Sequence, residues 1–173
     1  MKFTFKILLL LVVPVTFIYS QSSGNAVAVV SAKLIKGLGT QSIGGNLNFG
    51  DIVLTNSSST IYKNPDEGME IKISGHPEKN IILTYQPIEI NNSQWVAVNG
   101  GEEGALSFTP EIEHTSGNAS YTNASPVVSG GTYTLQNSDG EGIMYIWIGG
   151  NIQINDNQPA GNYSGVFQIN ISY

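Results

Sequence analysis

The carboxy-terminal stretch GNYSGVFQINISY, from Gly161 to Tyr173, alternates between two kinds of side chain. One parity is apolar, aromatic or glycine, and consists of Gly161, Tyr163, Gly165, Phe167, Ile169, Ile171 and Tyr173. The other parity is polar apart from Val166. Successive side chains of a pleated strand point to opposite faces, so this pattern predicts a half-buried strand that covers a core. We expect such a last strand either to finish its own domain or to be offered to a neighbour.

Short runs that favour strands recur along the rest of the chain. They are NAVAVVSAKLIK from Asn25, MEIKIS near Met69, IILTYQPIEI near Ile81, ALSFTPEIEH near Ala105 and GTYTLQ near Gly131. The segments between them are rich in residues that form turns. No run keeps the spacing of an amphipathic helix. Short strands separated by regular turn signals predict an all-β sandwich or barrel.

The segment IMYIWIGGNIQIN, residues 143–155, has the most apolar pattern of the mature chain. It is apolar on both parities through Trp147 and alternates from Ile152 onward. We expect a central strand that is buried on both faces and kinked or bulged at Gly149 and Gly150. Across the NDNQPAG turn, this strand is predicted to pair with the terminal strand as a hairpin.

The first twenty residues, MKFTFKILLLLVVPVTFIYS, have the layout of a secretory signal peptide, with two lysines before an apolar run. A membrane anchor is the alternative, but a span takes about 20 apolar residues. This run is shorter and contains Pro14. We therefore predict a signal peptide at residues 1–20 and one domain at residues 21–173, exported to the periplasm, the outer surface or the extracellular medium.

Charge and cysteine content restrict the partners. The chain has 7 basic and 13 acidic residues, and removal of Lys2 and Lys6 changes the formal charge from −6 to −8. An acidic chain with no Arg and no basic stripe argues against nucleic-acid binding. The chain has no Cys, so neither a disulfide nor a lipid-modified cysteine is available. Stability must come from core packing.

No motif for catalysis is present in the sequence. His76 and His114 stand alone in polar contexts and are predicted to be surface residues, and the HExxH and GxSxG motifs are absent. The carboxylates that could meet in space are Glu102, Glu103, Glu111 and Glu113. Their spacing does not predict a catalytic pair. We expect a protein that is not an enzyme and needs no cofactor.

The segment NSDGEG places Asn137, Asp139 and Glu141 at a spacing of two, as in part of a calcium loop. A full loop needs more oxygen ligands. The apolar runs on both sides favour a hairpin turn instead. We therefore predict a turn and no metal site.

Trp95 and Trp147, with Tyr121 and Tyr133, are candidates for an aromatic platform that binds sugars. Core packing is the alternative use of such rings. Trp147 lies in the most apolar run and is predicted to be buried. Trp95, in the polar context NNSQWVAVNG, is predicted to be the more exposed and is the candidate ligand contact.

NLNFGDIV from Asn46 and YIWIGGNIQINDNQPAGNYSGVFQINISY from Tyr145 resemble the signature stretches of an uncharacterised family of bacterial secreted domains. The pattern of that family is LxFG, then vGGxLxv, a short QxxG turn and GxYxGxFxvxvxY. The matching positions are Leu47, Phe49, Gly50, Gly149, Gly150, Ile152, Gln158, Gly161, Tyr163, Gly165, Phe167 and Tyr173.

That family is similar to spore coat protein U and to the pilin subunits of chaperone–usher fimbriae. The resemblance implies an immunoglobulin-like, pilin-like sandwich in which Gly161 and Tyr173 delimit the assembly strand. In pilins this strand is held by a chaperone and borders the groove that receives a neighbour's strand. Here the Tyr is last rather than penultimate, no disulfide is present, and the tail before the first predicted strand is short. The domain is therefore either complete or in need of a donated strand.

The leading functional prediction is a non-catalytic, exported surface structural or fimbrial-type subunit that assembles through β-strand contacts. Its expected partners are copies of itself, other surface subunits or a periplasmic chaperone. The alternative is a secreted sandwich module that binds a glycan or another ligand.

Overall fold

Two antiparallel β-sheets form the part of the chain that the computed structural model describes, residues 31–55 and 57–173. The larger sheet contains β1 (Gly39–Ser42), β2 (Ser59–Lys63), β3 (Met69–Gly75), β5 (Ile88–Asn91), β6 (Ala105–Ser116), β7 (Ser125–Pro126), β9 (Gln136–Ser138) and β10 (Glu141–Ile154). The smaller sheet contains β4 (Asn80–Tyr85), β8 (Gly131–Thr134) and β11 (Ile169–Ser172) in the order β11-β4-β8. The 3-10 turn η1 (Pro65–Glu67) and the helix α1 (Ser93–Asn99) complete the elements. The prediction of an all-β sandwich is confirmed.

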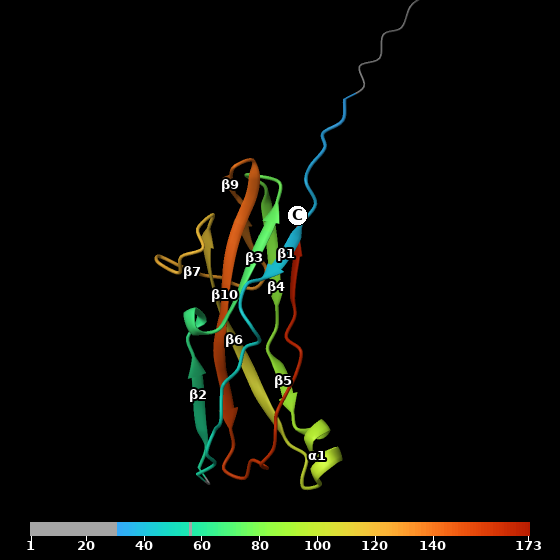
Figure 1. Cartoon of the computed structure of the whole chain (residues 1–173), viewed down its shortest axis with the longest axis vertical. Coiled ribbons are helices and arrows are strands. Elements are labelled where there is room, and N and C mark those ends of the chain that lie inside the picture. Colours follow the sequence, from blue (N-terminus) through green and yellow to red (C-terminus); the bar gives the residue numbers. More distant parts are fainter. Residues whose placement is uncertain (1–30, 56) are drawn as a thin grey trace, which may run out of the picture. The chain divides into compact units, whose positions relative to one another are not determined.

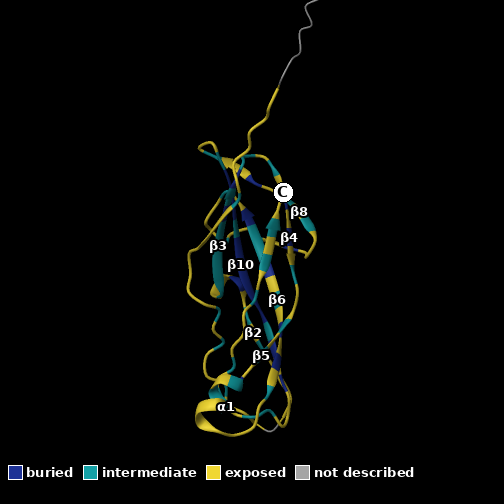
Figure 2. Cartoon of the chain, turned by 90° about the vertical axis from the view of Figure 1, so that its right-hand side faces the viewer, coloured by how far each residue is buried: buried dark blue, intermediate teal, exposed yellow. Residues whose placement is uncertain are grey.

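The long strand β10 is the centre of the larger sheet (Figure 1). Strand β6 pairs with one edge of β10 from Met144 to Gln153. On the other edge, β3 pairs with β10 as far as Ile148, and β2 pairs with it from Gly150 onward. Because both edges are paired and both faces are covered through its middle, β10 is largely buried, as predicted (Figure 2).

Gly149 and Gly150 lie where the partner on one edge of β10 changes from β3 to β2. A Cβ atom on Gly149 would lie 2.3 Å from the carbonyl oxygen of Lys63. A Cβ atom on Gly150, whose φ is +136°, would lie 2.3 Å from the carbonyl oxygen of Thr109. The ladder to β6 keeps a single register through both glycines, so the predicted bulge is not formed there. The glycines serve instead to let neighbouring backbones approach closely.

The predicted hairpin between β10 and the terminal strand is wrong. Strand β11 pairs with β4, from Ile169 opposite Tyr85 to Ser172 opposite Ile82. Near the NDNQPAG turn, the two edges of β10 are already occupied by β2 and β6. The returning chain therefore finds no free edge on β10, and it crosses to the smaller sheet.

Residues 161–173 keep much of the predicted alternation in burial but form a regular strand only in β11. Upstream, Ser164 pairs with Asn91 in an isolated bridge beside β5. The chain thus runs antiparallel to residues 80–91, first beside the larger sheet and then beside the smaller one. Pro87 separates β4 from β5 and has no N–H to donate. The ladder is consequently interrupted opposite this proline.

The first described strand, β1, begins at Gly39. Residues 31–36 are exposed and form no strand, so the prediction of a strand from Asn25 to Lys36 is wrong for that part. Strand β3 takes residues 39–42 as its partner instead. Residues 25–30 and the predicted signal peptide at 1–20 lie outside the described residues.

The helix α1 was not predicted, because seven residues are too few to show a helical period. Gly100, with φ of +76°, follows its last residue. The buried side chain of Asn92 braces the start of the helix: its Nδ2 donates to the carbonyls of Glu102 and Ala160, at 3.1 and 3.3 Å. Its Oδ1 accepts the N–H of Gly104 at 2.7 Å. One amide thereby joins three loops.

The apolar core has two parts. The inter-sheet cluster draws side chains from both sheets and consists of Ile73, Ile81, Leu83, Ile112, Val127, Leu135, Met144, Ile146 and Ile148. The open cluster lies on β6 and β10 of the larger sheet only, and consists of Leu106, Phe108, Ile152 and Ile154. Segments without strand structure, together with β2 and β5, contribute the half-buried residues that pack against the open cluster.

Candidate functional site

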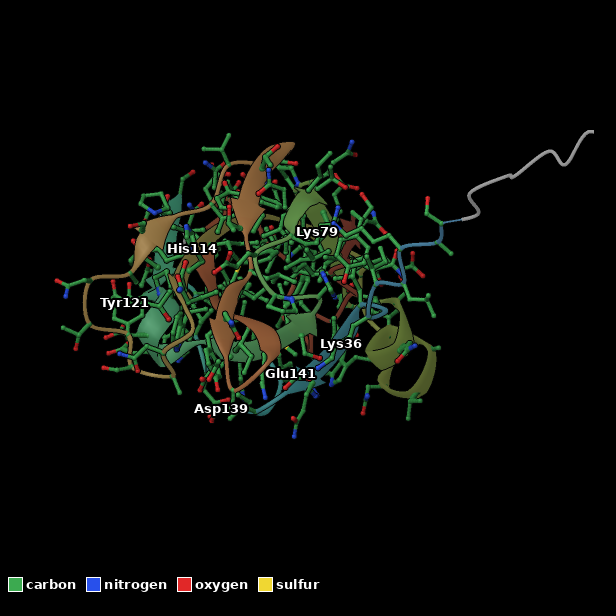
Figure 3. All side chains as sticks on the ribbon, turned by 90° about the horizontal axis from the view of Figure 1, so that it is seen from above. Lys36, Lys79, His114, Tyr121, Asp139 and Glu141 are labelled. Carbon is green, nitrogen blue, oxygen red and sulfur yellow. The ribbon has the colours of Figure 1, made fainter. Side chains whose placement is uncertain are left out.

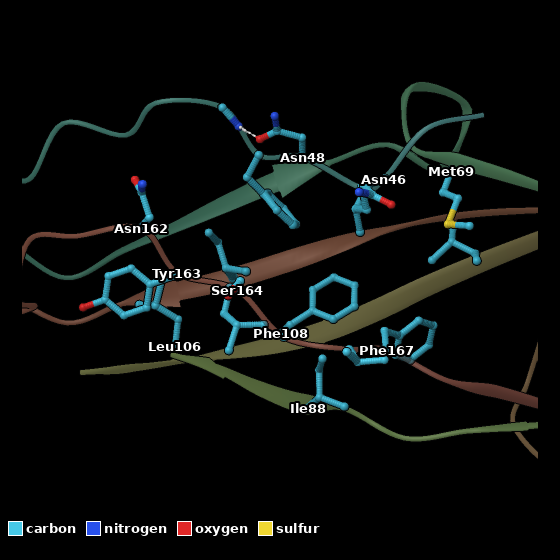
Figure 4. A pocket seen from close by; sticks show the side chains of 18 of the residues that line it. Asn46, Asn48, Met69, Ile88, Leu106, Phe108, Asn162, Tyr163, Ser164 and Phe167 are labelled. Atoms are coloured by element: carbon cyan, nitrogen blue, oxygen red, sulfur yellow. Dashed lines mark hydrogen bonds between the residues drawn. The ribbon is translucent and has the colours of Figure 1, made fainter. Parts of the chain in front are cut away.

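A long apolar groove of about 1420 Å³ runs between the two sheets and over the open cluster (Figure 4). Its floor is formed by inward side chains of β6 and β10, among them Phe108, Ile146, Ile148 and Ile152. One wall is the chain that leads into β11. The opposite wall is the segment between β1 and β2. We call this space the inter-sheet groove.

The first wall contains the inward residues of the predicted assembly strand. Phe167 packs edge-on against Phe108, with ring centroids 5.6 Å apart, and against Tyr85 at 6.2 Å. The hydroxyl of Tyr163 donates to the carbonyl of Pro159 at 2.6 Å. Gly165 lets this wall approach β5, because a Cβ atom there would lie 2.8 Å from a methyl carbon of Ile90. Ile169 and Ile171 continue the wall and are only half-buried.

The opposite wall is formed by residues 46–54, which we call the groove cover. Leu47, Phe49 and Ile52 are half-buried and pack against the open cluster. The ring of Phe49 meets that of Phe108 edge-on, with centroids 5.9 Å apart. The turn at Gly50 is fixed locally, since its N–H donates to the side chain of Asn48 at 2.8 Å (Figure 4).

The groove lies beside an unpaired sheet edge. Strand β11 is the outermost strand of the smaller sheet and pairs only with β4 among the described strands. Ile169 and Ile171 of this strand line the groove. Apolar side chains that are half-buried next to such an edge form the surface to which an added β-strand binds.

Tyr173, which follows β11, is held by hydrogen bonds to two other segments of the chain. Its hydroxyl donates to the carbonyl of Lys36 at 2.6 Å and accepts the N–H of His76 at 2.8 Å. A Cβ atom on Gly75 would lie 2.6 Å from that hydroxyl oxygen. The last residue of the predicted assembly strand is therefore engaged within its own domain.

Trp95, the candidate ligand contact, lies on α1 and is half-buried. A Cβ atom on Gly161 would lie 3.0 Å from its ring, and one on Gly101 would lie 3.7 Å away. Trp95 is thus packed against the start of the groove wall. Trp147 is buried, as predicted, with 5% of its surface exposed.

The outer face of the larger sheet carries a cluster that the sequence did not predict. The hydroxyl of Tyr62 donates to Glu111, and that of Tyr121 donates to Glu113. The ring of Tyr121 also lies edge-on to Trp147, with centroids 5.5 Å apart. The hydrogen bond to Glu111 raises the pKa of Tyr62 to about 12. Burial, followed by the bond to Glu113, raises the pKa of Tyr121. The spacing of two between the glutamates was the available signal, because it places both on one face of β6.

The prediction of two surface histidines is wrong for His114. Its ring is partly buried on the inner side of β6 and packs edge-on against Tyr133 of β8, with centroids 4.9 Å apart. Its Nδ1 is buried without a hydrogen-bond partner among the described residues. Burial lowers the pKa of this imidazole. Tertiary packing between the sheets, which polar sequence context does not report, accounts for the difference.

The NSDGEG segment forms the tight turn between β9 and β10 (Figure 3). Asp139 and Gly140 both have positive φ, at 51° and 80°, as a two-residue hairpin turn requires. The side chain of Asn137 accepts the N–H of Gly140, and Glu141 faces Lys72 at 3.7 Å. The oxygen of Asn137 is thus engaged within the hairpin, and the carboxylate of Glu141 by a lysine of β3. Across the described ranges, three or more His, Cys, Asp or Glu residues are nowhere grouped to hold a metal.

Comparison with protein-family models matches residues 38–173 to a domain of unknown function, DUF4402. No curated protein and no solved structure matches the chain. Within residues 31–55 and 57–173, no helix is long and apolar enough to cross a membrane.

Proposed function

We propose that this chain, which belongs to the DUF4402 family of domains of unknown function, is a non-catalytic, exported surface subunit that assembles through β-strand contacts. One observation carries the proposal: the inter-sheet groove has half-buried apolar walls and is lined by β11, one edge of which pairs with no described strand. We retain an immunoglobulin-like, pilin-like arrangement, and the resemblance to pilins and spore coat protein U, as part of this proposal.

A strand added along β11 would satisfy two needs of the groove at once. Its alternate side chains would cover Phe167, Ile169 and Ile171, and each apolar Å² removed from water contributes about 25 cal/mol. Its backbone would pair with the open edge of β11. The contact joins different surfaces of two copies, so it propagates into a filament unless the rotation closes a ring.

A second copy of the chain is the proposed source of the strand. Once a signal peptide of twenty residues is removed, the segment before β1 spans residues 21–38. The tail before the first described strand is therefore longer than the sequence pattern predicts. It includes the apolar run from Asn25 to Lys36, of which Leu34 is 85% exposed in its own domain. Twelve extended residues span about 40 Å, and the wall from Tyr163 to Ile171 needs about 30 Å. The lengths are compatible.

The charges of the two surfaces are also compatible. From Gln21 to Gly50 the chain has two lysines, Lys33 and Lys36, and no acidic residue. All 13 acidic residues follow from Asp51 onward, which makes the receiving domain acidic. Opposite net charge favours the encounter of a tail with another copy's domain. A periplasmic chaperone is a further proposed partner, because the apolar walls of the groove are only half-buried before assembly.

Light scattering and electron microscopy of residues 21–173 test the proposal. We expect polymers, and we expect a synthetic peptide of residues 25–36 to reduce their length by occupying free grooves. A peptide of the same composition in scrambled order is the control. A protein that stays monomeric at every concentration, and that does not bind the peptide, would contradict the proposal.

A second candidate, a module that binds glycans, is favoured by the outer cluster of Tyr62 and Tyr121 with its two glutamates, which lies next to the buried Trp147. Carboxylates and tyrosine hydroxyls are suitable partners for sugar hydroxyls, and aromatic rings stack on sugar faces. Trp147→Phe leaves Trp95 as the single tryptophan, so comparing the fluorescence of both forms against a carbohydrate panel would separate the outer cluster from α1. No response in either form would remove this candidate.

A further inference from the structure

We propose that the groove cover, residues 46–54, is a displaceable wall that closes one side of the inter-sheet groove in the free subunit and moves out to admit the strand of a second copy. This inference rests on the proposed function, because it concerns the same groove. It adds a regulated state: a closed subunit that protects its own apolar surface before assembly.

The cover is attached to the groove by side chains. Leu47 packs against both core clusters, and Phe49 and Ile52 pack against the open cluster. Each remains half-buried. The same segment leaves Val53 84% exposed and Leu54 40% exposed. A segment that buries some of its apolar residues and exposes others covers the groove incompletely.

The backbone of the cover is not tied to either sheet. No backbone–backbone hydrogen bond joins residues 45–55 to any other described residue. The last tie before the segment is the pair of N–H groups of Ile43 and Gly44, which both donate to the carbonyl of Glu70, at 2.9 and 3.5 Å. The next paired residues are those of β2, from Ser59. Between these anchors the cover can leave without breaking a ladder.

Opening of such a segment costs less than unfolding, since only its apolar contacts are lost. The open cluster lies on β6 and β10, which are paired to each other along ten residue pairs and stay so when the cover moves. A strand entering the groove would then replace the contacts of Leu47 and Phe49 with its own side chains, and would add the ladder to β11 that the cover does not make. The entering strand would therefore keep apolar contacts in the groove and add backbone hydrogen bonds to β11.

Thiol labelling of residues 21–173 tests the cover, because the chain has no Cys and an introduced thiol reports alone. Ile152→Cys places a thiol on the groove floor beneath the cover, and Ile73→Cys places one in the inter-sheet cluster; these side chains are 2% and 0% exposed. We expect iodoacetamide to label the thiol at position 152 at least about tenfold faster than the thiol at position 73. The rate at position 152 should not depend on dilute urea. Equal labelling rates at the two positions, both rising with urea as global unfolding does, would overturn the inference. Leu106→Cys, in the same cluster as Ile152, repeats the test if Ile152→Cys does not fold.

A second substitution in the Ile152→Cys background tests whether movement of the cover, rather than general loosening of the domain, exposes the thiol. Phe49→Ala should speed labelling about tenfold further, whereas Val53→Ala, on the same segment but exposed, should leave the rate unchanged. Equal effects of Phe49→Ala and Val53→Ala on the labelling rate would contradict the proposed role of the cover.

The peptide of residues 25–36 then distinguishes the two proposals. Fast labelling at position 152 that the peptide suppresses supports both. Fast labelling that the peptide leaves unchanged supports the cover and counts against assembly by this segment. Slow labelling at position 152 in a protein that still binds the peptide overturns the proposed displacement of the cover and leaves the assembly proposal standing.

Discussion

The hydroxyl of Tyr173, the last residue of the chain, donates a hydrogen bond to the carbonyl of Lys36, 137 positions earlier in the sequence. It also accepts the N–H of His76. Tyr173 follows β11 of the smaller sheet, and Lys36 precedes β1 of the larger one. One side chain thus holds the end of β11, the segment before β1 and the loop after β3 together.

Tyr173→Phe should lower the free energy of unfolding by about 1–2 kcal/mol, because it removes two hydrogen bonds that are each worth about 0.5–1.5 kcal/mol. Urea denaturation measures the change. The control is Tyr62→Phe, which removes one exposed hydrogen bond, to Glu111, and should change stability less. A neutral Tyr173→Phe would mean that the bridge contributes nothing to the fold.

Phe167→Ala should lower the free energy of unfolding by about 2 kcal/mol, which is below the range for a fully buried Phe because this ring is half-buried. It removes the edge contacts with Phe108 and Tyr85. The neighbouring Val166→Ala, at a side chain that is 79% exposed, should stay within about 0.5 kcal/mol. If both changes had the same effect, the inward and outward faces assigned to residues 161–171 would be wrong.

His114 should make stability depend on pH. Burial lowers its pKa in the folded state below the ordinary value of 6.5, so the unfolded chain binds the proton more readily. Its contribution is fully present above pH 6.5 and is lost as the pH falls from 6.5 through the lowered folded-state pKa. His114→Phe keeps a ring against Tyr133 and should flatten this decline between pH 7 and 5.5, as measured by urea denaturation. His76→Gln is the control, and an unchanged slope in His114→Phe would refute the assignment.

Gly150→Ala should prevent or severely weaken folding, by at least about 3 kcal/mol, since its Cβ would clash with the backbone of Thr109 and its φ is strained for alanine. Gly37→Ala provides the matched comparison, because nothing lies within 4 Å of its Cβ position. Circular dichroism and thermal melting of both variants measure the difference. A Gly150→Ala domain as stable as the Gly37→Ala domain would show that β6 and β10 can separate at this point.

Local patterns predicted much of the fold. The strand at MEIKIS, the long strand through Trp147 and the turn at NSDGEG follow from periods and turn residues that act over a few positions. The pairing of β11 with β4 did not follow, because it depends on which edges β10 leaves free. The shortening of the terminal strand depends on Pro87, a residue of the opposite chain segment. Pairing partners are a property of the assembled sheets.

The site was predicted in part. The alternation from Gly161 to Tyr173 identified one wall of the groove before its surroundings were known. The opposite wall, at NLNFGDIV, carries a family signature, but its contact with Phe108 depends on long-range packing that the sequence does not show. The spacing of Glu111 and Glu113 places both on one face of β6, but their partners Tyr62 and Tyr121 come from other segments, so the sequence does not predict the pairs.

Disulfide trapping between two copies is the most direct test of assembly through the groove, since residues 21–173 contain no Cys. One copy carries Val29→Cys or Val30→Cys, which would face opposite sides of the tail if it is added as an extended strand. The other copy carries one thiol at a position whose side chain faces the groove: Phe167, Ile169 or Ile171. Directly opposite residues on neighbouring strands have Cβ atoms about 4.5–5.5 Å apart, so a small backbone adjustment brings them to the roughly 3.5–4.5 Å that a disulfide spans. The account predicts a mixed dimer for at least one combination, formed faster than with the outward Asn170→Cys. If no combination forms a mixed dimer faster than the Asn170→Cys control, assembly by strand addition to β11 is contradicted.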